Sequence, residues 1–324
     1  MNIFVPKELL NMLELKGIFP IVATPFTADG QIDWQGYDRL IRTLVRGGCH
    51  ALTLFGIAGE YYKLADSERW QMAERLIALC REEGVPSIIS VTDHATEVAV
   101  QTAKRFEKMG ADSLMLLPPF FLKPGAAGIE HHIREVGQSV SIPIMVQYAP
   151  EQTGVAIAPE ILGQIANDLP TVQDFKIESK PAGHYISRLL DLTGGKVRIH
   201  VGNAGYNMIE MFGRGAVGAM PGCSMFDLYL KVDQALMDDK LDDAIGLHNQ
   251  LLSVLNHIRQ NVEMIIRFEK HILMRRGVIQ SDYCRLPSYD VDAHDERLFE
   301  TLWQRIQPYL EPITVPVTAT TQKV

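Results

Sequence analysis

A lysine and a glutamate two positions apart, Lys176 and Glu178, are the residues of this sequence best placed to do chemistry together. Both lie in 172–178, a largely apolar segment between two helix-like segments, which is typical of a β-strand. Residues i and i+2 of a strand point to the same face, and in a closed parallel barrel that face can be the interior. The charged form of a lysine is costly there, so its amine is expected to act as a nucleophile beside a carboxylate. Taken alone, such a segment is more often a structural Lys–Glu pair.

The elements that would position this pair repeat along the chain. Short apolar segments alternate with amphipathic helical segments, as expected for parallel strands that are covered on both faces. The strand segments are 17–26, 50–55, 87–92, 113–117, 143–148, 172–178, 197–201 and 216–220. Eight such units predict a (β/α)₈ TIM barrel of the α/β class, a fold that typically takes about 250 residues. The alternative is a doubly wound open sheet, but no GxGxxG motif follows the first strand, which disfavours its dinucleotide-binding version.

The helical segments give the predicted domain limits. Asp33 is suited to cap the first helix, which Gly47 ends. Similar helix start and stop signals recur in the segments between the strands. The barrel is expected to cover 16–238. Three more helices, at about 241–260, 262–276 and 293–310, predict a C-terminal extension over 239–311, with peripheral tails at 1–15 and 312–324.

Composition excludes several classes of protein. The chain of 324 residues has a formal net charge of −8 and no basic run, which argues against nucleic acid as a partner. No apolar run approaches the ~20 residues that a membrane span requires, so no membrane partner is expected. The four cysteines are far apart, which fits reduced thiols in a cytoplasmic protein better than disulfides or a zinc site.

The predicted barrel indicates where an active site would lie, because sites in this fold form at the C-terminal ends of the strands. Lys176 is the one lysine on a predicted strand at that end of the barrel. Lys123 also follows a strand, but it lies in a loop, where a solvated side chain is the default. This placement favours the catalytic interpretation of Lys176 over the structural one.

These strand ends resemble those of the pyruvate-dependent class I aldolase family, which includes dihydrodipicolinate synthase and N-acetylneuraminate lyase. The resemblance covers roughly 16–310 and rests on the order and spacing of Ala23-Thr24-Pro25-Phe26, Gly56-x-x-Gly59-Glu60, Leu117-Pro118-Pro119-Phe120-Phe121-x-Lys123-Pro124, Pro150-x-x-Thr153-Gly154 and Phe175-Lys176. It implies a (β/α)₈ barrel with C-terminal helices, commonly a homotetramer, whose barrel lysine forms a Schiff base with a small 2-keto acid. Lys176 takes that position.

The loop after the second strand departs from the family pattern. Family members usually have Gly-Thr-Thr-Gly-Glu or Gly-Thr-Ser-Gly-Glu there, whereas this chain has the apolar residues Ile57 and Ala58 between Gly56 and Gly59. The side-chain hydroxyls are therefore missing. The loop amides can still bind a substrate carboxylate, because backbone N–H groups need no particular side chain.

The fifth strand also departs from the pattern, at the tyrosine that usually shuttles protons. Counting back from Pro150, that position is Gln147. The neighbouring Tyr148 should point the other way, unless a one-residue bulge turns it inward. Phe121 falls where the synthases carry a second tyrosine, and Gln152 where they carry an arginine. The hydroxyl relay is thus expected to be absent, which disfavours dihydrodipicolinate synthesis and neuraminate cleavage.

One branch of the family, the L-2-keto-3-deoxyarabonate dehydratases, resembles the present pattern. It has glutamine in place of the tyrosine and a glutamate two residues after the lysine, as in Gln147 and Glu178. The resemblance implies a Schiff-base lyase without metal or cofactor that converts L-2-keto-3-deoxyarabonate, or a similar sugar acid, to 2-oxoglutarate semialdehyde. Lys176 would be the nucleophile, Glu178 the acid–base group, and Gln147 a hydrogen-bonding partner of a hydroxyl or water.

Other residues and other functions remain open at this point. The residues expected to contact substrate are Gly56, Ile57, Ala58, Gly59, Phe121, Tyr148 and Asn203. His94, His200 and Tyr283 are further candidates, although a structural or surface role is more usual for such histidines. The alternative reactions are retro-aldol cleavage to pyruvate and an aldehyde, and a condensation like that of dihydrodipicolinate synthase. A 2-keto acid sensor or scaffold without catalysis is the non-enzymatic alternative.

Overall fold

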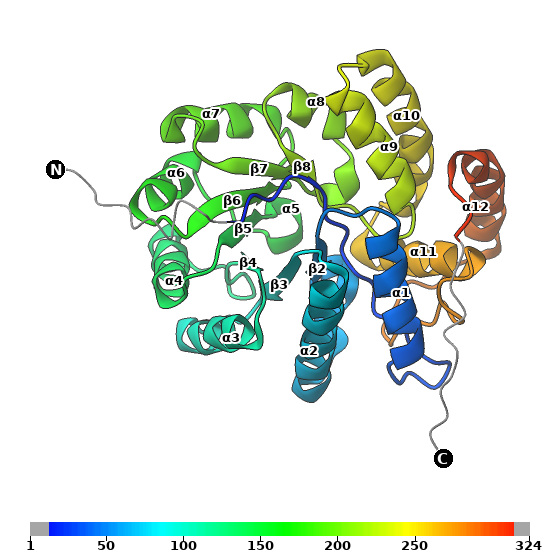
Figure 1. Cartoon of the computed structure of the whole chain (residues 1–324), viewed down its shortest axis with the longest axis horizontal. Helices are drawn as coiled ribbons and strands as arrows, with labels where there is room; N and C mark the ends of the chain where they lie inside the picture. Colours follow the sequence, from blue (N-terminus) through cyan, green and yellow to red (C-terminus); the bar gives the residue numbers. More distant parts are fainter. Residues whose placement is uncertain (1–12, 314–324) are drawn as a thin grey trace.

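The computed structural model describes residues 13–313, in which eight parallel strands form one curled sheet (Figure 1). The strands are β1 (Gly17–Ile18), β2 (Leu52–Leu54), β3 (Ser87–Val91), β4 (Ser113–Leu116), β5 (Ile144–Tyr148), β6 (Val172–Ile177), β7 (Arg198–Val201) and β8 (Gly218–Ala219). Their order is β1-β8-β7-β6-β5-β4-β3-β2. Ile21 forms parallel bridges to Thr53 of β2 and to Gly222 beyond β8, which closes the ring. The (β/α)₈ barrel predicted from the sequence is confirmed.

The helices surround this ring (Figure 1). Those of the barrel are α1 (Trp34–Arg46), α2 (Asp66–Glu83), α3 (Thr96–Met109), α4 (Ala126–Ser139), α5 (Pro150–Thr153), α6 (Pro159–Asp168), α7 (Gly183–Thr193), α8 (Met208–Gly213) and α9 (Phe226–Met237). The Asp33 side chain caps α1 by accepting a hydrogen bond of 2.9 Å from the Gly36 amide, as its sequence context predicts.

The first strand is shorter than predicted. The apolar segment 17–26 yields only Gly17–Ile18 as a paired strand, followed by isolated bridges at Ile21 and Phe26. Pro20 and Pro25 explain the difference, because proline has no N–H to donate to a neighbouring strand. The segment still runs through the barrel, so its side chains reach the positions that the strand prediction gave them.

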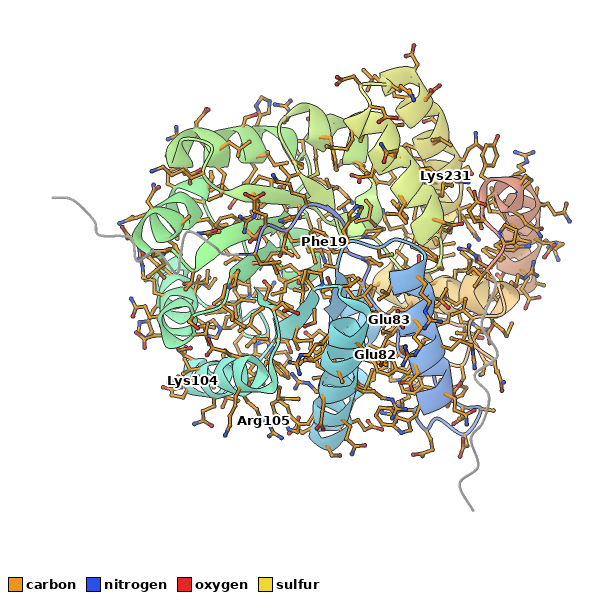
Figure 2. All side chains as sticks on the ribbon, viewed as in Figure 1. Phe19, Glu82, Glu83, Lys104, Arg105 and Lys231 are labelled. Atoms are coloured by element: carbon orange, nitrogen blue, oxygen red, sulfur yellow. The ribbon has the colours of Figure 1, made fainter. Side chains whose placement is uncertain are left out.

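Two apolar cores hold the barrel together. A large one fills the space between the strands and the surrounding helices. A smaller one lies inside the ring and consists of Leu15, Phe19, Ile21, Ala51, Ile88, Met115, Met145 and Met220; Figure 2 labels Phe19 among the strands. Successive side chains along a strand point alternately to these two cores, so each strand position faces either the inside of the ring or the surrounding helices.

Three helices follow the barrel: α10 (Leu241–Ile258), α11 (Val262–Arg275) and α12 (Ala293–Ile306). Helix α10 packs on α9, and α11 packs on the short 3₁₀ turn Ile57–Gly59 that follows β2. The boundary between the barrel and the C-terminal extension, placed between 238 and 239, stays a prediction. Most of the predicted tails, 1–12 and 314–324, lies outside the described residues. In the part of the chain that the structure describes, no helix is long and apolar enough to cross a membrane.

Candidate active site

Lys176 and Glu178 lie together at the C-terminal end of β6, inside the barrel. The Lys176 Nζ atom is 3.5 Å from Glu178 Oε1, and the two side chains are 5% and 8% exposed. Both point to the interior because their strand positions differ by two. An amine and a carboxylate are therefore held within reach of one small molecule.

The carboxylate of Glu178 is fixed at both oxygens. Gln147 Nε2, from the neighbouring strand β5, donates a hydrogen bond of 2.6 Å to Oε2. The backbone N–H of Asn203, just after β7, donates one of 2.7 Å to Oε1. Gly202 makes room for this arrangement, since a Cβ atom there would lie only 2.1 Å from Glu178 Cγ. The geometry gives Glu178 a defined orientation beside the lysine.

A cavity of about 440 Å³ opens above these residues. One part of its wall is apolar and comes mainly from the segments that follow β1, β2 and β8 and from α11. The other part is polar and comes from β5, β6, the segments that follow them, the turn after β7 and the end of α10. The lining residues are Ile21, Ile57, Ala58, Gln147, Glu151, Gln152, Lys176, Glu178, Lys180, Asn203, Ala204, Met220, Pro221, Gly222, Arg259, Gln260, Asn261, Val262 and Ile265. A volume of this size suits a small-molecule ligand.

The predicted carboxylate-binding loop contributes two of its four residues to the cavity. Ile57 and Ala58 line it, whereas Gly56 and Gly59 are not among its lining residues. The two glycines allow a close approach to the first strand: a Cβ at Gly56 would lie 2.8 Å from Ile21 Cγ2, and one at Gly59 would lie 3.1 Å from the carbonyl oxygen of Val22. Their role in this structure is therefore to seat the loop.

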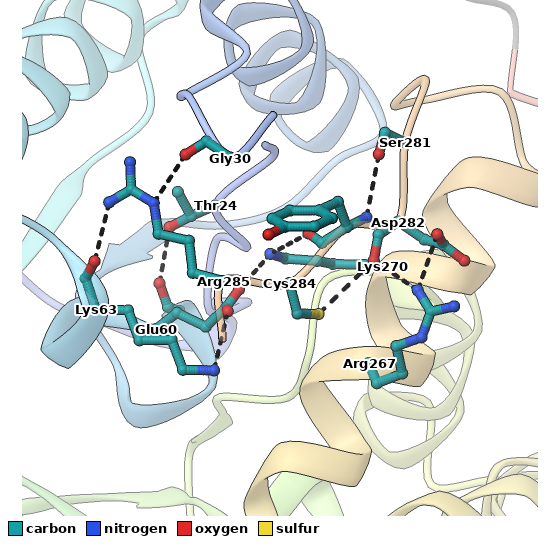
Figure 3. A network of polar contacts seen from close by, with 12 residues as sticks. Thr24, Gly30, Glu60, Lys63, Arg267, Lys270, Ser281, Asp282, Cys284 and Arg285 are labelled. Atoms are coloured by element: carbon teal, nitrogen blue, oxygen red, sulfur yellow. Dashed lines mark hydrogen bonds and ion pairs between the residues drawn. The ribbon is translucent and has the colours of Figure 1, made fainter. Parts of the chain in front are cut away.

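Buried charges hold the same loop from behind (Figure 3). Glu60 is fully buried and has a left-handed backbone conformation, with φ of 59°. Its carboxylate forms ion pairs with Lys270 of α11 and, at 3.4 Å, with Lys63. The Lys270 Nζ atom also donates to the carbonyl oxygen of Tyr283. These contacts tie the loop after β2 to the C-terminal helices.

Tyr148 is not among the residues that line the cavity, in contrast to the substrate contact expected of it from the sequence. Its ring stacks on Tyr185 of α7, with centroids 4.5 Å apart, and belongs to the core between strands and helices. The irregularity in the β5–β6 pairing lies between Ile144 and Met145, before the functional positions. Gln147 then pairs directly with Lys176, so Gln147 faces inward and Tyr148 outward.

Phe121 is likewise absent from the cavity wall. Its side chain is 78% exposed on the loop after β4, near the ring of His94. His94 accepts a hydrogen bond from the Phe120 amide, and Tyr283 packs beside Gly30 at the edge of the barrel. The described structure therefore gives none of these residues a contact with the cavity.

Below Lys176 lies a buried ion cluster that the sequence analysis did not identify. Asp174 accepts hydrogen bonds from Arg198 Nη2 at 2.6 Å and shares one of 2.8 Å with His200 Nε2. Burial tends to raise the pKa of Asp174, but these contacts outweigh it and leave the pKa below its ordinary value. The spacing of Asp174, two before Lys176, was the available signal. His200 thus has a structural partner rather than a place at the cavity.

Arg259 is the other residue that sequence reasoning missed. It follows the last residue of α10, lines the cavity, and donates a hydrogen bond of 2.7 Å to Asn203 Oδ1. No local motif marks it, because only the packing of α10 on the barrel brings it to the site. Among residues 13–313, no group of three or more His, Cys, Asp or Glu side chains could hold a metal ion.

Comparisons with known proteins agree on one family. The model of the dihydrodipicolinate synthetase family matches residues 14–305. The chain is 28% identical to the L-2-keto-3-deoxyarabonate dehydratase of Azospirillum brasilense, over 90% of this chain and 95% of that protein. It is 30% identical to the 4-hydroxy-tetrahydrodipicolinate synthase of Salinibacter ruber, over 74% and 79%.

Solved structures give the same result. A putative dihydrodipicolinate synthetase from Pseudomonas aeruginosa superimposes with a TM-score of 0.84 at 28% identity, covering 90% of this chain and 100% of that one. The dihydrodipicolinate synthase of Rhodopseudomonas palustris also gives 0.84, at 26% identity, with 91% and 99% covered.

Proposed function

Because this chain belongs to the dihydrodipicolinate synthetase family, we propose that it is a Schiff-base lyase that dehydrates a 2-keto-3-deoxy sugar acid. The observation that supports dehydration is the Glu178 carboxylate, which lies 3.5 Å from Lys176 Nζ. It is held by Gln147, at the position where family members usually carry a proton-shuttling tyrosine. The likeness to the Azospirillum brasilense dehydratase favours L-2-keto-3-deoxyarabonate as the substrate.

In the proposed reaction, Lys176 attacks the C2 ketone and water is lost to form an iminium ion. The iminium makes the C3 protons acidic, and Glu178 removes one of them to give an enamine. The enamine expels the C4 hydroxyl, which takes the proton back from Glu178 and leaves as water. Tautomerisation and addition of water to the imine release 2-oxoglutarate semialdehyde and regenerate the free lysine.

Gln147 orients this proton transfer without taking part in it. Its amide nitrogen donates to Glu178 Oε2, so the carboxylate is held in one rotamer beside the lysine. A glutamine has no readily exchanged acidic proton to supply. Its place in the mechanism is therefore that of a positioning residue for Glu178.

Retro-aldol cleavage is the second candidate reaction. It starts from the same Schiff base but requires a base to remove the proton of the C4 hydroxyl. The family tyrosine suits that task, whereas Gln147 does not, and Tyr148 lies outside the barrel against Tyr185. These placements favour dehydration over cleavage and over a synthase-type condensation.

We further propose a cytoplasmic homotetramer. The support is the family membership. Oligomeric state varies among related proteins, and one solved neighbour is described as a monomeric dihydrodipicolinate synthase variant. Sedimentation equilibrium of the full chain tests the tetramer directly.

The decisive experiment is to incubate the protein with L-2-keto-3-deoxyarabonate and identify the products by NMR. 2-Oxoglutarate semialdehyde without pyruvate supports the dehydratase. Pyruvate with glycolaldehyde would instead establish a retro-aldolase. Absence of turnover, together with absence of any adduct after borohydride reduction, would support the sensor or scaffold alternative.

A further inference from the structure

Arg259 brings a positive charge from the C-terminal helices into the cavity. Its guanidinium lies 4.3 Å from the centroid of the Tyr206 ring, and Nη1 donates a hydrogen bond of 2.7 Å to Asn203 Oδ1. The stacking and the hydrogen bond hold the planar group in one orientation at the polar wall. An arginine fixed in this way presents its remaining donors in a set direction.

Arg259 differs from the other cations of the cavity wall in having no carboxylate partner. Lys176 pairs with Glu178, and Lys180 pairs with Glu151 at 2.6 Å. Within residues 13–313, no carboxylate lies at ion-pair distance from Arg259. A positive charge that is half-buried and unpaired is costly, which makes the wall at this point attractive to an oxygen acceptor.

Two buried donors beside each other point to the same conclusion. Arg259 Nε and Asn203 Nδ2 are both buried and have no hydrogen-bond partner in the described structure. The Asn203 amide orientation is fixed, because its Oδ1 accepts from Arg259 and leaves Nδ2 as the donor. Buried donors without partners are rare in folded proteins, so this part of the wall has more hydrogen-bonding capacity than the protein itself uses.

The position of these donors relative to Lys176 identifies the part of the ligand that they would meet. Asn203 contacts Glu178 through its backbone N–H and Arg259 through its side chain. These contacts run in the order Lys176, Glu178, Asn203 and Arg259, from the nucleophile past the acid–base group to the end of α10. A keto acid bound at Lys176 would meet Arg259 only with carbons beyond the one that loses its hydroxyl.

We propose that Arg259, oriented by Asn203, forms a subsite for the far end of the keto acid, where its guanidinium takes an oxygen acceptor. The inference rests on the proposed function for the location of the ketone. The acceptor is either a terminal hydroxyl or a second carboxylate, and both present lone pairs to the guanidinium of Arg259. The subsite selects extended sugar acids over pyruvate, which has no atoms beyond C3.

The test compares ligands that differ only at the far end, in the wild-type protein and in Arg259→Met and Arg259→Lys. The ligands are pyruvate, a five-carbon 2-keto-3-deoxy acid ending in a hydroxymethyl group, and a six-carbon one ending in a carboxylate. Half-saturating concentrations are measured by borohydride trapping and, independently of imine formation, by the rise in thermal unfolding midpoint. Arg188→Met, which removes an exposed arginine paired with Glu160, is the matched control.

Arg259→Met is expected to raise the half-saturating concentration of the extended acids about tenfold or more and that of pyruvate less than about twofold. Arg259→Lys should recover part of the loss. A larger loss for the carboxylate-ended acid assigns the acceptor as a carboxylate, and a larger loss for the hydroxymethyl acid assigns it as a hydroxyl. An equal loss for pyruvate, or no loss for either extended acid, overturns the subsite. These half-saturating concentrations report binding, whereas product identification reports the reaction. Failure of the proposed dehydration is therefore distinguished from failure of the subsite.

Discussion

Gln147 and Glu178 are joined across β5 and β6 by a hydrogen bond of 2.6 Å between Nε2 and Oε2. The amide of Asn203 occupies the other carboxylate oxygen, so Glu178 is oriented from two sides while it stays within 3.5 Å of Lys176. A carboxylate held in this way is preorganised for proton transfer at the carbons next to a Schiff base.

Glu178→Gln should separate imine formation from dehydration. The variant keeps the size of the side chain but cannot take up a proton, so kcat should fall by about 10²–10⁴-fold. Pyruvate should still be trapped on the protein by borohydride, because Lys176 is untouched. Steady-state kinetics and intact mass measure the two effects. Near-normal kcat in this variant would remove Glu178 from the mechanism.

Lys176→Met should abolish the covalent adduct altogether. Methionine fills a similar volume without an amine, so the buried site loses its nucleophile and little packing. After reduction with borohydride, peptide mapping of the wild-type protein should place the adduct on Lys176 and not on Lys180, which also lines the cavity. An adduct that persists in Lys176→Met would assign the Schiff base to another lysine.

Tyr148→Phe should leave kcat and KM within about twofold of wild type, because a substitution away from the cavity removes no contact with substrate. The Tyr148 ring stacks on Tyr185 on the outer side of β5, and the exchange preserves that stacking. Steady-state kinetics on the sugar acid provide the measurement. A loss of activity of a hundredfold would mean that the hydroxyl shuttles protons, and would favour retro-aldol cleavage.

Much of the fold could be predicted because strand and helix periodicity is a local property. The alternation along β5 and β6 placed Lys176 and Glu178 on one face and separated Gln147 from Tyr148, and the register between these strands agrees. The first strand is shorter than its apolar sequence predicts, because Pro20 and Pro25 have no N–H to donate to a neighbouring strand.

The site was less predictable where it depends on contacts between distant segments. Phe121 was placed at the site by analogy of position, but its side chain is largely exposed. Arg259 and Lys270 had no local signal, because their roles arise only when α10 and α11 pack against the open end of the barrel. Sequence periodicity identifies the face on which a residue lies, whereas tertiary packing decides which residues that face meets.

Lys270→Met should destabilise the protein more than removal of any exposed lysine. It leaves the buried carboxylate of Glu60 with Lys63 alone at 3.4 Å, and loss of one partner in a buried pair typically costs about 3–5 kcal/mol. Urea unfolding measures the change. Lys231→Met is the matched control, because Lys231 pairs with Glu311 on the surface, where such pairs are worth about 0–1 kcal/mol.

Adding Glu60→Gln to Lys270→Met should restore part of that loss, since the unpaired charge is then removed. The double variant should still bind keto acids less tightly, because the turn that carries Ile57 and Ala58 has lost its attachment to α11. If Lys270→Met and Lys231→Met unfold at the same urea concentration, the buried pair does not stabilise the loop.

His132→Gln should remove one component of the acid sensitivity of folding. Burial lowers the pKa of His132 in the folded protein from 6.5 to about 4. The unfolded chain therefore binds a proton between about pH 6.5 and 4 that the folded protein does not, and this contribution lowers the free energy of unfolding as the pH falls through that window. It is complete below the folded pKa and absent above the unfolded one. The slope from one such group is at most about 1.4 kcal/mol per pH unit.

The measurement is the difference in unfolding free energy between wild type and His132→Gln at several pH values. Because the other titrating groups are common to both proteins, the difference isolates this histidine. It should be constant above about pH 7 and should shift in favour of the variant as the pH falls towards 4.5. Glutamine can keep a hydrogen bond to Thr96, whose Oγ1 lies 3.1 Å from His132 Nδ1. A difference independent of pH would mean that His132 protonates equally well in the folded protein, and that α4 does not shield it from water.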